Sequence, residues 1–246
     1  MTTEIHLPLL LAAMGLVAAL YASVGHGGAS GYLAIMAMAA FPAAAMRPTA
    51  LVLNIAVSLL AGVAFFRFGH FRGSLFWPFA ASSIPFAYLG GSLRVHSAVF
   101  QILLALALTF AALRLVLPAP NRPPRPAPAW LVVLMGAALG LVSGLIGIGG
   151  GIFLTPLVIL CGWADAKTAS GISAPFILVN SLAGLAGLGA DGLSHLAPAW
   201  PAMLAAVLAG GAIGSLWGSG AAHPRAVKAA LSLVLALATV KLIATL

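Results

Sequence analysis

The chain has 246 residues, of which 63% are hydrophobic and only 6% are charged. Soluble domains carry about a quarter charged residues, so this composition excludes an ordinary soluble protein and indicates an integral membrane protein. Eleven Lys and Arg residues stand against three acids. The basic residues lie singly or in pairs between apolar runs, where they report membrane topology, so we expect no nucleic-acid partner.

Two features of the sequence concern processing and cysteine chemistry. Cys161 is the only cysteine, which excludes an intrachain disulfide and a cysteine-rich metal site. We interpret it as a packing residue and expect neither a metal nor a cofactor. The N-terminal stretch MTTEIHLPLLLAAMGLVAALYA has an acid and a histidine where a signal peptide would have Lys or Arg. It is therefore predicted to be the first membrane element.

The apolar segments form two sets of similar order and length. They lie near residues 7–23, 29–41, 48–66, 74–93 and 97–117, and then near 130–146, 150–162, 171–189, 198–218 and 225–244. Between the sets, PAPNRPPRPAPA at 118–129 is Pro-rich and basic, and it can neither pack nor continue a helix. We predict a first repeat at 1–117, a cytoplasmic linker at 118–129 and a second repeat at 130–246.

Internal similarity supports a duplication. A shift of about 122 residues places VGHGGASGYL (24–33) on IGIGGGIFLT (146–155) and SLLAG (58–62) on NSLAG (180–184). With one more residue of shift, GSL at 91–93 falls on GSL at 214–216. Three short matches in register indicate two structural repeats, as in many transporters.

The second segment of each half is too short to cross a membrane. About 13 residues at a rise of 1.5 Å span only about 20 Å of a hydrocarbon core about 30 Å thick. The first two segments of each half form either a broken helix that crosses once or a hairpin that returns to its starting side. The hairpin agrees better with the positive-inside rule. In the hairpin topology, eight basic residues lie on the cytoplasmic side: Arg67, Arg72, Arg114, Arg122, Arg125, Lys167, Arg225 and Lys228. Three lie on the outer side: Arg47, Arg94 and Lys241.

This topology inverts the second half relative to the first and places both termini outside. The predicted fold class is an all-α polytopic membrane protein with two inverted repeats. Each repeat consists of a short, glycine-broken, re-entrant-like helical hairpin and three transmembrane helices.

The glycine motifs GHGGASG and GIGGG are the predicted site. Non-helical backbone is tolerated at membrane depth only where protein or a water-filled cavity satisfies its polar groups. A helix that starts after a glycine turn presents free N–H groups and the positive end of its dipole, which attract anions. The candidate substrate-binding residues are Gly25, His26, Gly27, Gly28, Ala29, Ser30, Gly147, Gly149, Gly150, Gly151, Asn54 and Asn180.

The alternative is that such glycines only let helices pack closely, which we prefer for the glycines of LGGSL (89–93) and GSGAA (218–222).

The polar residues favour an anion as the substrate. Glu4, Asp165 and Asp191 fall in or near predicted loops, so no carboxylate lies at depth to bind a cation. His26 either hydrogen-bonds an oxyanion, titrates during transport or satisfies a nearby carbonyl. Secondary polar candidates are Ser23, Thr49, Ser58, Ser143, Thr155, Ser170 and Ser173.

Two further pairs of residues have open roles. Asn54 and Asn180 differ by about one helical turn in repeat register, so both can face one cavity, although each alone suits a helix–helix hydrogen bond. Arg47 and Arg94 are expected at the outer mouth, where they either attract anions or are simply solvated.

GLVSGLIGIGGGIFLTPLVIL (140–160) and its weaker echo YASVGHGGASGYLAIM (21–36) resemble the TauE/SafE family of membrane permeases. The resemblance extends over nearly the whole chain, including GGAIGSLWGS (210–219). It implies a multi-pass carrier of the bacterial inner membrane for small sulfur-containing anions, such as sulfite, sulfoacetate or other organosulfonates. Transport would be driven by protons or another coupling ion. The first motif departs from the family pattern at His26 and its Ala-Ser-Gly continuation.

Two other functions stay open at this point. A passive anion channel would use the same architecture. An intramembrane serine hydrolase would use Ser30 in GASG (28–31), but it needs a base histidine on another membrane helix. The remaining candidates, His70, His96, His195 and His223, fall in predicted loops.

Overall fold

The computed structural model describes residues 7–94, 96–116 and 125–220. Glu4, most of the linker, the segment near 225–244 and the predicted position of both termini lie outside the described residues. Within these residues the chain is all-α, as predicted. Its helices are α1 (Leu7–Ala22), α2 (Ala29–Met38), α3 (Ala43–Arg67), α4 (Gly73–Ser92), α5 (Ser97–Val116), α6 (Ala129–Ile146), α7 (Gly151–Leu160), α8 (Ala166–Ser194) and α9 (Trp200–Gly220).

Two helices are longer than their predicted segments. α3 begins at Ala43 rather than near residue 48, because the charge of Arg47 is met by carbonyl groups and does not end the helix. α8 begins at Ala166 because the carboxylate of Asp165 caps it, accepting a 2.8 Å hydrogen bond from the amide of Thr168. The predicted end at 189 is an internal break, where Gly189 has a φ of 68°.

The lengths of the helices fit a multi-pass membrane protein. Among the described residues, α3, α6, α8 and α9 are long and apolar enough to cross a membrane. α2 and α7 have only 10 residues each. Large apolar side chains such as Leu16, Phe66 and Ile213 lie on the outside of the bundle, where they suit a lipid environment.

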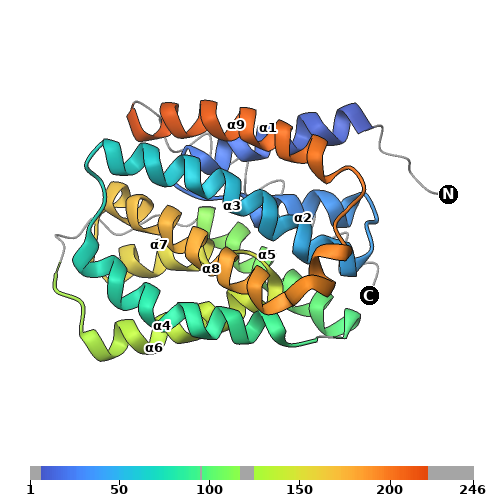
Figure 1. Cartoon of the computed structure of the whole chain (residues 1–246). Coiled ribbons are helices and arrows are strands. Elements are labelled where there is room, and N and C mark those ends of the chain that lie inside the picture. The colour runs from blue at the N-terminus through green and yellow to red at the C-terminus, as the bar shows by residue number, and fades with distance from the viewer. Residues whose placement is uncertain (1–6, 95, 117–124, 221–246) are drawn as a thin grey trace.

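The helices form a bundle with a central pair and two flanking pairs (Figure 1). α3 and α8 pack against each other in the middle, α1 lies along α9 on one side, and α4 lies along α6 on the other. α3 and α8 run in opposite directions, since Gly62 approaches Ala174 and Pro175 while Leu51 approaches Gly184.

Glycines spaced by one helical turn make the flanking contacts close. In α9, a Cβ on Gly210 or Gly214 would strike the backbone of α1, and a Cβ on Gly218 would strike that of Ser23, directly after α1. In α6, a Cβ on Gly140 or Gly144 would strike the backbone of α4. Small residues at this spacing let helix backbones approach in membranes. Gly218 and Gly91 therefore have the packing role predicted for their motifs.

This packing predicts a local loss of stability. Gly214→Ala places a methyl group against the carbonyl oxygen of Ala19, and overpacking of this kind costs about 1–3 kcal/mol. We expect a lower midpoint of thermal unfolding in detergent. Gly220→Ala is the matched control, because none of the described residues lies within 4 Å of its added Cβ. Equal midpoints for the two variants would contradict the close contact of α1 with α9.

The second hairpin begins and ends at the same end of the bundle. The amide of Arg125, just before α6, donates to the carbonyl of Gly162 at 2.7 Å, and its Nε donates to the carbonyl of Cys161 at 2.9 Å. Gly162 directly follows α7 and its cap residue. The segment before α6 thus lies next to the end of α7, as expected for a hairpin that returns to its starting side.

Candidate functional site

Glycines in the left-handed region form both interhelical turns. Between α1 and α2, Gly25 has a φ of 73° and Gly28 has a φ of 97°. Between α6 and α7, the φ angles of Gly147, Gly149 and Gly150 are 85°, 74° and 79°. Residues with a Cβ rarely adopt this conformation. α2 starts directly after the first turn, at Ala29, and α7 starts after the second, at Gly151.

The two turns meet in the interior, although they are far apart in the sequence. The Nε2 atom of His26 in the first turn lies 3.1 Å from the carbonyl oxygen of Gly151 at the start of α7. Only 9% of His26 is exposed. The candidate residues of the two motifs therefore form one cluster.

Asn54 of α3 connects the two turns. Its Oδ1 accepts a 3.2 Å hydrogen bond from the amide of Ala29, one of the amides that a helix leaves unpaired at its start. Its Nδ2 donates to the carbonyl of Ile148 at 3.4 Å and to the hydroxyl of Ser181 at 2.9 Å. This fully buried amide thus binds the first turn, the second turn and α8 at once. Ser181 was not predicted, although it stands in the repeated NSLAG segment.

A chain of polar groups continues from His26 into the second half. Thr155 Oγ1 of α7 lies 3.2 Å from His26 Nε2 and 2.6 Å from Ser173 Oγ of α8. The other ring nitrogen, Nδ1, lies 2.9 Å from the carbonyl oxygen of Val24. The secondary candidates Thr155 and Ser173 are therefore part of the cluster.

Asn180 has a different environment from Asn54. Its Nδ2 donates to the carbonyl of Phe176 in the same helix at 2.8 Å, while its Oδ1 is buried without a hydrogen-bond partner among the described residues. The hydroxyl of Ser143 is likewise buried and unpartnered within the described part of the chain. It lies beside the second turn, 3.6 Å from where a Cβ on Gly150 would be. A free buried hydroxyl there is a donor that a ligand can use.

The turns are closed in this structure. A Cβ on Gly27 would strike Oδ1 of Asn54, a Cβ on Gly149 would strike its Nδ2, and a Cβ on Gly151 would strike Ile177. At these positions the turns have no room for a methyl group. A ligand between them requires the hairpins to move apart.

Ser30 of the GASG motif has no hydrolase geometry. Its hydroxyl donates to the phenol oxygen of Tyr21 at 2.8 Å, whereas a serine nucleophile needs a neighbouring base. His26, the histidine nearest in sequence, contacts Thr155 and Gly151 instead.

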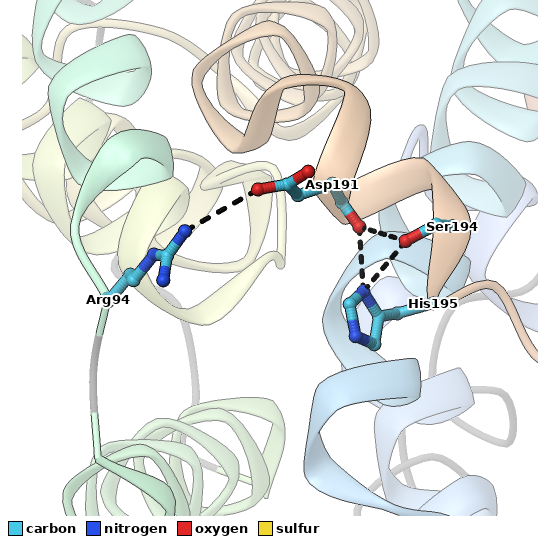
Figure 2. A network of polar contacts seen from close by, with 4 residues as sticks. All are labelled: Arg94, Asp191, Ser194 and His195. Atoms are coloured by element: carbon cyan, nitrogen blue, oxygen red, sulfur yellow. Dashed lines mark hydrogen bonds and ion pairs between the residues drawn. The ribbon is translucent and has the colours of Figure 1, made fainter.

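A pocket of about 500 Å³ opens at one end of the bundle, where α4 and α8 end and α3 begins. Arg94 lies at this pocket with its side chain 93% exposed and pairs with Asp191 at 3.5 Å. Figure 2 shows this ion pair and two contacts of the Asp191 backbone. The hydroxyl of Ser194 donates to the carbonyl oxygen of Asp191, and Nδ1 of His195 lies 2.7 Å from the same oxygen. Arg94 is therefore a solvent-exposed residue of this pocket.

Arg47 also lines this pocket, but it is not a loop residue. It lies in the second turn of α3 with only 8% exposed. Its guanidinium donates to the carbonyls of Gly90, Gly91 and Leu93 at the end of α4, and to that of Gly144 near the end of α6. Two helix C-termini, each with partial negative charge, thus stabilise this buried cation.

Arg47→Lys keeps the charge but has fewer donors in a different geometry, so at least one carbonyl loses its partner. An unpaired buried group costs about 1–3 kcal/mol, and we expect a lower thermal unfolding midpoint in detergent. Arg67→Lys, at an exposed position at the end of α3, should leave the midpoint unchanged. A midpoint of Arg47→Lys equal to that of Arg67→Lys would show that these contacts contribute little.

The fold and the site together define a class: a multi-pass helical membrane protein with broken helices meeting in its interior, the arrangement of many transporters. Residues 10–242 match the family model described as sulfite exporter TauE/SafE. The chain belongs to the TauE/SafE family of membrane transporters, as its motifs predicted.

The chain is also similar to a named relative. It is 35% identical over 235 residues to the probable membrane transporter protein y4hK of Sinorhizobium fredii (strain NBRC 101917 / NGR234). The match covers 92% of this chain and 94% of the relative. No solved structure matches the chain significantly.

Proposed function

We propose that the chain is a secondary transporter of the bacterial inner membrane that moves small sulfur-containing anions, such as sulfite, sulfoacetate or other organosulfonates, by alternating access. The observation that carries this proposal is the meeting of two buried glycine turns, each followed directly by a helix N-terminus. Helix N-termini attract anions through their free amides and their dipole. The sulfur chemistry of the substrate follows from the family.

The contacts between helices support two inverted repeats. The first helix of each proposed half packs along the fourth helix of the other half: α1 along α9, and α6 along α4. Each half also has a basic residue near the start of its third helix that donates to carbonyls at the end of its fourth. Arg47 does so toward α4, and Lys167 toward Gly218 and Ser219 of α9. A pseudo-two-fold axis in the membrane plane would relate the α1–α9 contact to the α6–α4 contact, and the contacts of Arg47 to those of Lys167.

The polar groups around the turns suit an oxyanion. The unpartnered hydroxyl of Ser143 and the hydroxyls of Thr155 and Ser173 are donors within the cluster. Both acids of the described residues are engaged away from the turns: Asp165 caps α8, and Asp191 pairs with Arg94. A negative charge between the turns would therefore meet donors rather than carboxylates.

The pocket at the end of the bundle is the proposed access route. Arg94 is at its mouth and Arg47 is buried in its wall. Arg47 also borders the second turn, because a Cβ on Gly147 would lie 2.9 Å from its Cγ. Basic side chains along this route raise the local concentration of anions. An anion that passes Arg47 reaches the turns once the hairpins separate.

Flux in proteoliposomes tests this function. Purified protein should catalyse saturable uptake of sulfite or sulfoacetate that depends on a counterion gradient, while chloride should not compete. Uptake that rises linearly with concentration and ignores the gradient would indicate the passive channel instead. If proteoliposomes take up sulfite and sulfonates no faster than empty liposomes do, the proposal is contradicted.

A further inference from the structure

Both ring nitrogens of His26 lie at hydrogen-bonding distance from carbonyl oxygens. Nδ1 is 2.9 Å from the oxygen of Val24 in its own turn, and Nε2 is 3.1 Å from the oxygen of Gly151 in the opposite hairpin. A carbonyl only accepts, so each contact needs a proton on nitrogen. Neutral imidazole has one N–H, whereas imidazolium has two. The observed geometry therefore satisfies both carbonyls only when the ring is protonated.

Loss of the proton has a defined consequence for these contacts. If Nδ1–H continues to donate to Val24, the lone pair of Nε2 faces the oxygen of Gly151 with no hydrogen between them. The hydroxyl of Thr155, 3.2 Å away, then donates to Nε2. Ser173 can donate to Thr155 in turn, because either hydroxyl of that 2.6 Å pair can be the donor. Deprotonation thus replaces a bond between the two turns by a repulsive contact.

The described groups around His26 are polar. α1 presents Tyr21, a titratable phenol that lies edge-on at 6.3 Å between ring centroids. α7 presents the hydroxyl of Thr155, which is in contact with the hydroxyl of Ser173 of α8. A protonated ring would thus be stabilised by two carbonyl dipoles.

We propose that His26 is the proton-binding site that couples transport to a proton gradient. One proton on the ring holds the two glycine turns together, and in this closed arrangement there is no room for an anion between them. Release of the proton frees the carbonyl of Gly151 and lets the hairpins separate, so that an anion can enter. The inference rests on the proposed transport function, and it identifies the coupling ion as a proton that moves in the direction opposite to the anion.

The test is proteoliposome transport with two simultaneous readouts: sulfoacetate uptake and internal pH from a trapped fluorescent indicator. With the inside one pH unit more acidic and the membrane potential held at zero, one-to-one exchange should increase the accumulation of the anion about tenfold and raise the internal pH. His26→Gln keeps an amide donor toward Gly151 but does not titrate. Any anion uptake that this variant retains should move no protons and should not respond to the gradient. His96→Gln, at an exposed position before α5, should behave as wild type.

The outcomes separate the two proposals. Anion uptake by wild type without proton movement, or proton-coupled uptake by His26→Gln, overturns this inference and leaves the transport function intact. Absence of any anion uptake by wild type overturns the transport function and this inference together. If His26→Gln does not fold, proton release on sulfoacetate binding to wild type in weakly buffered detergent decides the question. We expect up to one proton to be released per bound anion, and no proton release between pH 5 and 8 would overturn the proposal.

Discussion

Asn54→Leu is expected to reduce anion flux about a hundredfold. The substitution keeps the approximate volume of the side chain but leaves the amide of Ala29 and the carbonyl of Ile148 without their partner. Each unpaired buried group costs about 1–3 kcal/mol, and a loss of about 2.7 kcal/mol corresponds to a hundredfold change. The substitution would destabilise the closed arrangement, in which the Asn54 side chain binds both turns. Flux in proteoliposomes at equal protein density measures the effect.

The control for Asn54→Leu is a buried polar residue whose side chain bonds within its own helix. Ser83 of α4 is fully buried, and its hydroxyl donates to Ala80 in its own helix. Ser83→Ala should retain nearly full flux. If Asn54→Leu transports at the wild-type rate, the contact between the turns through Asn54 is not required for transport.

Gly149→Ala is expected to reduce anion flux by more than tenfold while the protein still folds. Its φ of 74° already disfavours a side chain, and the added methyl group would strike Asn54 Nδ2 and lie 2.9 Å from the hydroxyl of Ser181. The substitution thus separates the second turn from the residue that connects it to the first. We expect flux below a tenth of wild type, with a similar elution profile in size-exclusion chromatography.

Gly69→Ala separates backbone strain from loss of space. Gly69, between α3 and α4, has a φ of 76°, close to that of Gly149, but no residue in the described part of the chain lies within 4 Å of an added Cβ. Both variants carry a similar conformational penalty, of order 1 kcal/mol. Only Gly149→Ala also fills the junction. Equal flux in the two variants would show that close approach of the turns is not needed.

The sequence predicted the helix breaks well because their physical cause is local. Glycine at positive φ and a following short apolar segment are visible in GHGGASG and GIGGG without knowledge of any partner. Both turns and the helices that start at Ala29 and Gly151 appear where these motifs placed them. His26, the ionisable residue of the first motif, likewise lies in the cluster.

Tertiary contacts explain what the sequence did not predict. Arg47 looked like a loop charge because the carbonyls that stabilise it come from residues 43 to 97 positions away. Asn180 seemed the counterpart of Asn54, yet its neighbour Ser181 makes the contact. Successive residues of a helix point about 100° apart, so a register error of one residue selects the wrong side chain. Only the packing of α8 on α3 fixes that choice.

The central claim is that the anion binds between the two glycine turns, and crystals soaked in 2-bromoethanesulfonate test it most directly. The anomalous signal of bromine locates the ligand without reference to the protein. The account predicts a peak between the turns, with the sulfonate near the amides at the start of α2 and α7 and near Ser143. A peak confined to the pocket beside Arg94, or elsewhere on the surface, would contradict it.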